Sequence, residues 1–166
     1  YFNNKGFTEE SCIQNLDFTQ TGEYFIVLKQ FCNERIQIND IEFKINIQKN
    51  LDNIVCLGQE IIVSTNKIFK GICILCASEW GSNYDDIIIN SGDNNYDVCI
   101  NAFNISIIDQ KDSIYFGKTI SADGKCINEK AALTFNKYLF NKGINIERIS
   151  LPYSPNLHII AITFLL

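Results

Sequence analysis

The sequence predicts an all-β, mainly antiparallel fold of about ten strands, a β-sandwich or jelly-roll-like domain, with one short helix near residues 128–142. Apolar and polar residues alternate strictly over residues 41–48, which is the pattern of a strand with one wet face. The chain is rich in Ile, a β-branched residue that suits a pleated surface. Clusters of Gly, Asn, Asp and Ser interrupt the apolar runs and mark turns.

The expected strands are short apolar or alternating runs, each bounded by turn residues. In chain order they cover residues 23–32, 35–38, 41–48, 53–57, 60–64, 68–77, 86–90, 97–108, 113–120, 145–151 and 157–166. Their spacing of about 8–15 residues is typical of antiparallel sandwiches and barrels.

The expected helix near residues 128–142 depends on spacing and on end signals. Ala132, Phe135 and Leu139 recur at intervals of three and four residues, as on one face of a helix. Asn128 is a suitable N-cap, and Gly143 stands where a left-handed C-terminal residue is favoured. A strand over residues 134–140 is the alternative.

The domain organisation is expected to be one β-sandwich over residues 19–166. Residues 1–18, which are polar with spaced aromatics, form either an arm that reaches a neighbouring subunit or an ordinary first strand. The last segment, 157–166, is apolar at both odd and even positions, so it belongs in the middle of a sheet or under a subunit interface.

Composition and charge exclude several function classes. A net charge of −5 argues against a phosphate-neutralising face, and we therefore expect no nucleic-acid partner. The longest apolar run, residues 157–166, is shorter than the roughly 20 residues that a bilayer requires, so no membrane span is expected. His158 is the only histidine, which removes most hydrolase triads and His-rich metal sites. We interpret it as a buried, hydrogen-bonded side chain.

Seven cysteines and the lack of methionine indicate a processed protein in an oxidising, extracellular or cell-surface setting. Cys73 and Cys76 lie three positions apart in a predicted buried strand, so their side chains are expected on opposite faces, too far apart to pair. The odd number suggests a bridge between subunits or one free thiol. The candidates for disulfides are Cys12, Cys32, Cys56, Cys99 and Cys126. Small buried free thiols are the alternative.

Two polar segments, residues 80–86 and 91–97, combine aromatic rings with side-chain oxygens. The candidate ligand-binding residues are Trp80, Tyr84, Asp85, Asp86, Asp93, Asn95 and Asp97. Rings stack on sugar faces and carboxylates or amides bind hydroxyls, while the same oxygens suit Ca²⁺. The plainer interpretation is ordinary turn chemistry. Two loops at opposite ends of one strand would not meet.

No catalytic motif stands out, and the sequence gives no cofactor other than Ca²⁺ under the binding alternative. We therefore expect a non-enzymatic extracellular structural subunit, a fibre, coat or appendage protein. It would form homo-oligomers or polymers through strand contacts, with intermolecular disulfides as a further link. The alternative is a secreted carbohydrate-binding, lectin-like module with a glycan partner.

Overall fold

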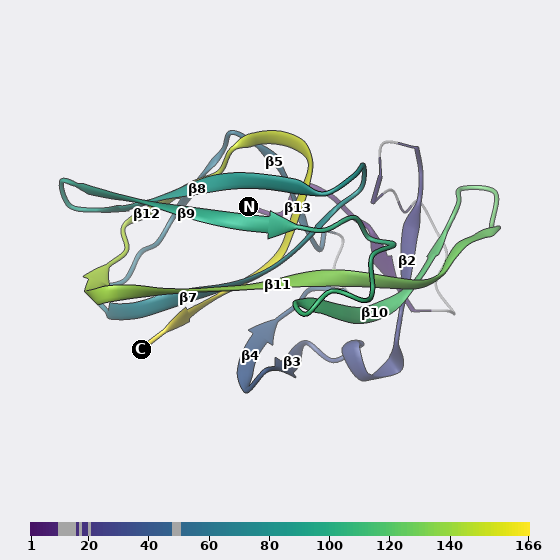
Figure 1. The fold of residues 1–166 in the computed structure, drawn as a ribbon, viewed down its shortest axis with the longest axis horizontal. Helices are drawn as coiled ribbons and strands as arrows, with labels where there is room; N and C mark the ends of the chain where they lie inside the picture. Colours follow the sequence, from purple (N-terminus) through teal and green to yellow (C-terminus); the bar gives the residue numbers. More distant parts are fainter. Residues whose placement is uncertain (10–15, 17, 20, 48–50) are drawn as a thin grey trace.

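The computed structural model describes residues 1–9, 16, 18, 19, 21–47 and 51–166 (Figure 1). Thirteen strands and one short 3₁₀ helix lie within these residues. In chain order they are β1 (Phe7–Thr8), β2 (Tyr24–Val27), η1 (Lys29–Phe31), β3 (Arg35–Ile38), β4 (Ile41–Lys44), β5 (Ile54–Leu57), β6 (Glu60–Ile62), β7 (Ile68–Ser78), β8 (Asn83–Ser91), β9 (Asn94–Ala102), β10 (Ser113–Ile120), β11 (Cys126–Asn145), β12 (Arg148–Ser150) and β13 (Tyr153–Leu165). The prediction of an all-β, mainly antiparallel sandwich is confirmed.

The strands form three sheets that stack in layers. A central seven-stranded sheet has the order β1-β2-β10-β11-β7-β13-β5, and neighbouring strands in it are antiparallel except β1 and β2. A four-stranded sheet, β6-β12-β8-β9, covers one of its faces, and the β3–β4 hairpin lies against the other. Figure 1 shows β8 and β9 above, β7 and β11 in the middle and β3 and β4 below.

Strand β7 lies at the centre of the layers and is buried on both faces from Gly71 onward. Its side chains alternate between two cores: Cys73 and Leu75 pack toward the β3–β4 hairpin, whereas Ile74 and Cys76 pack toward the four-stranded sheet. The expectation that Cys73 and Cys76 occupy opposite faces is therefore confirmed. A strand buried on both sides has no need for polar alternation, which explains its continuous apolar sequence.

Two tight turns set the register of the hairpins. Asn39 and Asp40 join β3 to β4 and both have positive φ, of 50° and 62°, as a two-residue type I′ turn requires. Gly92 joins β8 to β9 together with Asp93, and only Gly92 has positive φ, of 56°. Both turns match the right-handed twist of the strands they connect.

The predicted helix near residues 128–142 is wrong, because this segment is the long strand β11. Phe135 and Leu139 are four residues apart, and a four-residue interval keeps two side chains on one face in a strand as well as in a helix. Backbone pairing with β10 on one side and β7 on the other decides in favour of the strand. Gly143 is no helix cap: it lies in an irregular part of the β11–β7 ladder beside Ile68.

Side chains form hydrogen bonds with backbone groups at both outer edges of the central sheet. Asp52 accepts hydrogen bonds from the backbone N–H groups of Gly6 (2.9 Å) and Phe7 (3.1 Å) beside β1. At the opposite edge, the amide of Asn3 accepts from the N–H of Val55 (2.8 Å) and donates to its carbonyl (3.1 Å). These side chains occupy backbone groups that an added strand would otherwise use.

The four-stranded sheet has the same kind of edge. The Tyr1 hydroxyl accepts a hydrogen bond from the N–H of Ile62 in β6 (3.0 Å). In β9, the Asn101 N–H donates to Asn136 Oδ1 (2.9 Å), and Asn136 Nδ2 donates to the Asn101 carbonyl (2.8 Å). The Asn136 amide thus takes the position of a strand partner and links the two sheets.

The first residues of the chain contribute to the common core. Phe7 of β1 and Phe18 are fully buried and contact Phe25, with ring centroids 5.1 Å and 4.9 Å from its ring. The division of the chain at residue 18 stays a prediction.

Among the described residues, no helix has the length and apolar character needed to cross a membrane.

Each of the six cysteines that the structure describes is free, and Cys12 lies outside the described residues. Pairing among Cys32, Cys56, Cys99 and Cys126 within the chain, as the candidate set allowed, is therefore not found. Cys56 is buried between the two large sheets, whereas Cys99 and Cys126 are exposed on different strands. Burial raises the pKa of Cys56 to about 12, so this thiol stays protonated.

Candidate functional site

The solvent side of the four-stranded sheet, called the outer face below, carries side chains from all four strands. Strand pairing places them in register, so that residues far apart in the sequence stand in rows. The outer face consists of Glu60 and Ile62 from β6, Arg148 and Ser150 from β12, Tyr84, Asp86, Ile88 and Asn90 from β8, and Asn95, Asp97, Cys99 and Asn101 from β9.

A row of hydrogen-bonded polar side chains crosses the outer face. Arg148 donates from Nη1 to Glu60 (3.3 Å) and from Nε to Asn90 Oδ1 (3.3 Å). Asn90 Nδ2 in turn donates to Asn95 Oδ1 (2.6 Å). The Arg148–Glu60 ion pair is about half exposed, so it contributes little to stability. Its main effect is to hold the guanidinium group in a defined orientation.

Exposed aromatic rings lie at the far end of the same hairpin. Tyr84 is 67% exposed and Trp80 is 60% exposed, values unusual for rings of this size. Trp80 belongs to the turn before β8, where the Ser78 hydroxyl donates to the Trp80 carbonyl (3.4 Å) and Asn83 donates to Ser78 (2.6 Å). Asn104 donates to the carbonyl of Glu79 (3.0 Å), so the turn is anchored to the segment that follows β9.

The structure distributes the seven sequence-predicted residues over one hairpin rather than over two loops. Tyr84, Asp86, Asn95 and Asp97 lie on the outer face, and Trp80 precedes it. Asp85 is half-buried on the inner side of β8, opposite Ile100, and Asp93 occupies the hairpin turn.

The calcium alternative would need most of these oxygens around one ion. Asp85 and Ser91, the last strand residue before the turn, are six positions apart in extended chain, a span of about 20 Å. Among the described residues, no group of three or more His, Cys, Asp or Glu side chains is placed to hold a metal ion. A Ca²⁺ site built from the predicted set is therefore not brought together.

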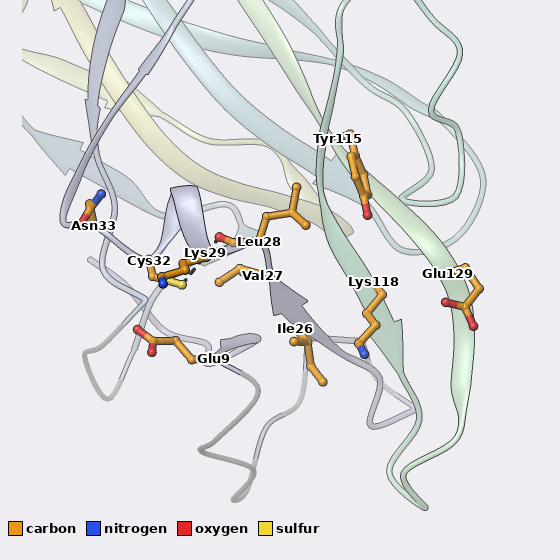
Figure 2. A pocket seen from close by; sticks show the side chains of 10 residues that line it. All are labelled: Glu9, Ile26, Val27, Leu28, Lys29, Cys32, Asn33, Tyr115, Lys118 and Glu129. Atoms are coloured by element: carbon orange, nitrogen blue, oxygen red, sulfur yellow. Dashed lines mark hydrogen bonds between the residues drawn. The ribbon is translucent and has the colours of Figure 1, made fainter.

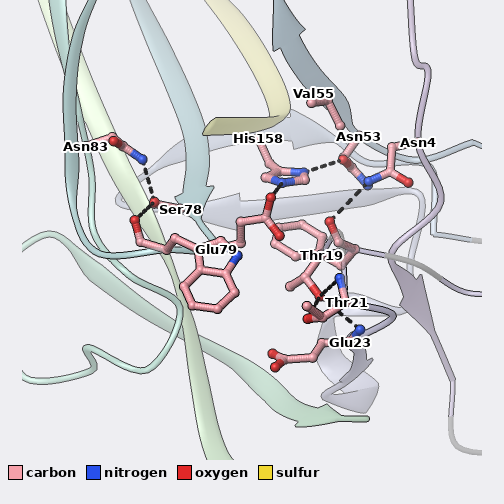
Figure 3. A network of polar contacts seen from close by, with 12 residues as sticks. Asn4, Thr19, Thr21, Glu23, Asn53, Val55, Ser78, Glu79, Asn83 and His158 are labelled. Atoms are coloured by element: carbon pink, nitrogen blue, oxygen red, sulfur yellow. Dashed lines mark hydrogen bonds and ion pairs between the residues drawn. The ribbon is translucent and has the colours of Figure 1, made fainter. Parts of the chain in front are cut away.

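A second polar cluster is buried around His158, and no sequence motif marks the partners of this histidine (Figure 3). Asn53 Nδ2 donates to Asp52 (2.8 Å), so Asn53 Oδ1 must accept, and His158 Nδ1 donates to it (3.0 Å). The other ring nitrogen, Nε2, lies 3.9 Å from Glu79 Oε1. Phe18 stacks on the imidazole with ring centroids 4.1 Å apart.

This cluster has the composition of a catalytic dyad but not its access to solvent. His158, Asn53 and Asp52 are each at most 1% exposed, and Glu79 is buried as well. Glu23 lies at the periphery, where burial and the charge of Glu79 raise its pKa. The interpretation of His158 as a buried, hydrogen-bonded residue is confirmed, and the cluster joins the N-terminal segment to β5, β7 and β13.

The Asp52 carboxylate is the most enclosed charge in this region. It forms an ion pair with Lys5 (2.7 Å) and accepts the two backbone N–H groups beside β1. Burial raises the pKa of Asp52, while Lys5 and the hydrogen bonds oppose that rise. The side chain therefore organises the N-terminal strand; it is not available to a ligand.

An open cavity of about 760 Å³ lies beside β2, η1 and β10 (Figure 2). Its lining includes Lys29, Cys32 and Lys118, with Glu9 and Glu129 as opposing charges. Burial and Glu9 raise the pKa of the Cys32 thiol, so at neutral pH it is protonated and a poor nucleophile. The lining offers mixed charge without an activated nucleophile.

The fold and the outer face together define an all-β sandwich protein that presents a polar sheet face with exposed aromatic rings. The chain belongs to the AziU2-like beta-sandwich domain family, whose family model matches residues 1–165. Comparison with curated proteins gives no match.

Proposed function

We propose that this protein is a non-enzymatic binding module that holds a saccharide against the outer face of its four-stranded sheet. The observation that carries this proposal is the hydrogen-bonded row Glu60–Arg148–Asn90–Asn95, which shares one sheet face with the exposed ring of Tyr84. Tyr84 and Asn90 are about 20 Å apart along β8, so a saccharide that contacts both is an oligosaccharide of several units. Sugar hydroxyls both donate and accept hydrogen bonds, and the row offers a guanidinium group, amides and a carboxylate. An aromatic ring provides an apolar surface for the C–H face of a sugar.

The rigidity of the face supports the same proposal. Its polar groups project from paired strands, and their bonds to one another restrict their rotamers before any ligand arrives. Binding then costs less side-chain entropy than it would on mobile loops. An extracellular or cell-surface location, where glycans are abundant, belongs to this proposal.

Replacing Tyr84 with alanine is expected to weaken saccharide binding about tenfold, because stacking is lost while the polar row is kept. A glycan array identifies a binding saccharide, and titration calorimetry with that saccharide measures the change. Tyr153→Ala is the matched control, since Tyr153 is 77% exposed but belongs to β13 of the central sheet. No binding to any glycan, or equal weakening by both substitutions, would refute the proposal.

A self-assembling structural subunit is the second candidate, and two exposed thiols favour it. Cys99 on β9 and Cys126 at the start of β11 are the described cysteines that face solvent, as a bridge between subunits requires. The side-chain bonds along the sheet edges count against assembly by strand addition. Assembly through disulfides between the surfaces of two subunits is compatible with these edge hydrogen bonds.

Under the second candidate, oxidation should produce reducible dimers or larger species that Cys99→Ser/Cys126→Ser lacks. Desolvation raises the pKa of each thiol, and a neighbouring carboxylate, Asp86 beside Cys99 and Glu129 beside Cys126, raises it further. Bridge formation should therefore be slow at pH 7 and faster at pH 9, where more thiolate is present. Non-reducing electrophoresis and size-exclusion chromatography measure this, with Cys56→Ser as the control for a buried thiol. Monomer under all conditions would exclude this route.

A further inference from the structure

Large apolar side chains are exposed where the start of β7 lies beside the last part of β11 and the end of β13. Ile68 is 57% exposed, Leu139 59% and Leu166 67%, and Leu165 is partly exposed beside them. These four residues are called the apolar tip below. In Figure 1, the start of β7 and the end of β11 lie at the left, next to the C-terminus.

Strand register brings Leu139 and Leu165 of the apolar tip together on one face. Leu165 and Leu139 are the partners of Gly71 from its two sides, so the two leucines flank the glycine. A Cβ atom at Gly71 would lie only 2.9 Å from a Leu139 methyl carbon, which shows how closely that side chain covers the glycine. Ile68 begins β7 at the same end, against Gly143.

The β3–β4 hairpin protects the neighbouring part of this face but not the tip. Phe43 of β4 packs edge-to-face against Phe135 of β11, with ring centroids 6.1 Å apart. Thr163 donates from its hydroxyl to the carbonyl of Glu42 (2.7 Å). Leu139 and Leu165 lie farther along the same strands, and Leu139 is mostly exposed to solvent.

Four exposed lysines lie within three residues of Ile68 or Leu139 along the chain. Lys67 and Lys70 flank Ile68 along β7 and the segment before it, while Lys137 and Lys142 flank Leu139 along β11. All four are exposed, and none forms an ion pair with a residue in the described part of the chain. This local positive charge contrasts with the net charge of −5 for the whole chain.

Nearby acidic groups do not cancel this charge within the tip. Glu42 belongs to the β3–β4 hairpin and is paired with Arg35. Glu147 is exposed beyond the end of β11, next to Arg148. This end of the molecule therefore combines a group of exposed apolar side chains with exposed lysines beside them along the chain.

We infer that the apolar tip is a docking surface for an anionic lipid bilayer. Ile68, Leu139 and Leu166 would enter the boundary between headgroups and acyl chains, and the lysines would contact lipid phosphates. Charge complementarity favours this partner over a second copy docked through the same surface, because two such surfaces would bring eight lysines together. A nucleic acid would satisfy the lysines but leave the apolar side chains without apolar contacts.

The test is sedimentation of the full chain with vesicles of phosphatidylcholine alone or mixed with phosphatidylserine. We expect binding to the mixed vesicles only, and weaker binding at 1 M salt, where the Debye length falls to about 3 Å. Each lysine near an anionic surface strengthens partitioning about fivefold, so Lys137→Gln/Lys142→Gln should weaken it about 30-fold. Leu139→Gln should weaken it about tenfold through lost apolar burial.

Lys29→Gln/Lys130→Gln is the matched charge control, because both lysines are exposed at other places on the molecule. Circular dichroism and thermal unfolding of each variant establish that it folds. Equal weakening by the control pair would show general charge attraction and overturn the assignment of the tip. Absence of binding to phosphatidylserine vesicles, or a dimer that Leu139→Gln dissociates, would overturn the lipid partner itself.

Discussion

Replacing Asp52 with alanine is expected to lower the free energy of unfolding by about 4 kcal/mol, because several buried partners lose their acceptor at once. The Asp52 side chain is fully buried and is the acceptor for the N–H groups of Gly6 and Phe7. Its loss also leaves the Lys5 ammonium group, 22% exposed, without its counter-charge. Urea unfolding, followed by circular dichroism, measures the change.

Asp123→Ala is the control for this prediction. Asp123 also pairs with a lysine, Lys125, at 2.9 Å, but both side chains are mostly exposed. An exposed pair of this kind contributes at most about 1 kcal/mol. If the two substitutions had similar effects, the assignment of Asp52 as the organiser of the N-terminal strand would be wrong.

The pH dependence of Asp52→Asn relative to the parent protein tests the cause of the Asp52 pKa shift. Because burial raises the pKa of Asp52 above its ordinary value of 3.8, the folded state holds this proton more tightly than the unfolded chain does. The contribution of Asp52 to stability should therefore decrease as the pH rises from 3.8 through the higher pKa of the folded state. An increase over this range would show that Lys5 and the hydrogen bonds outweigh burial.

Phe116→Ala should also lower the free energy of unfolding by about 4 kcal/mol, through lost apolar burial and the cavity that remains. Phe116 of β10 is fully buried in a cluster of phenylalanines. Its ring stacks on Phe31 of η1 with centroids 4.7 Å apart and meets the ring of Phe7 edge-on at 5.4 Å. The substitution therefore weakens the contacts that hold η1 and β1 against the central sheet.

Tyr115→Ala is the matched control for Phe116→Ala. Tyr115 precedes Phe116 on β10, is 43% exposed and points to the other face of the strand. Its loss should change stability by about 0.5 kcal/mol or less, as for most surface positions. Equal effects on the urea midpoint would mean that Phe116 is less enclosed than its contacts indicate.

Local sequence patterns identified most strands, because burial and turn geometry determine which residue types occur at neighbouring positions. Residues 35–38 and 113–120 were predicted with the bounds that the structure has. The alternation from Ile41 onward is present in β4, where Phe43 is buried and Glu42 and Lys44 are exposed. The segment near residues 128–142 could not be assigned this way, since its four-residue spacing fits a helix and a strand equally well.

The candidate site was only partly predictable for a related reason. Tyr84, Asp86, Asn95 and Asp97 lie within one hairpin, so their proximity in space follows from their proximity in the sequence. Arg148 and Glu60 join them through the pairing of β12 with β8 and of β6 with β12, and Arg148 lies more than fifty residues away along the chain. No local pattern encodes such a contact.

The amino-acid sequence by itself determined the all-β class, the positions of most strands, the buried state of His158 and the opposite faces of Cys73 and Cys76. These properties depend on hydrophobic periodicity, which acts between near neighbours. Tertiary structure alone decided that β11 is a strand, that the cysteines described are free, and that Asn3 and Asn136 bond to sheet edges. These outcomes depend on which distant segments become partners, because a backbone N–H or a side-chain amide is satisfied equally well by partners near or far in the chain.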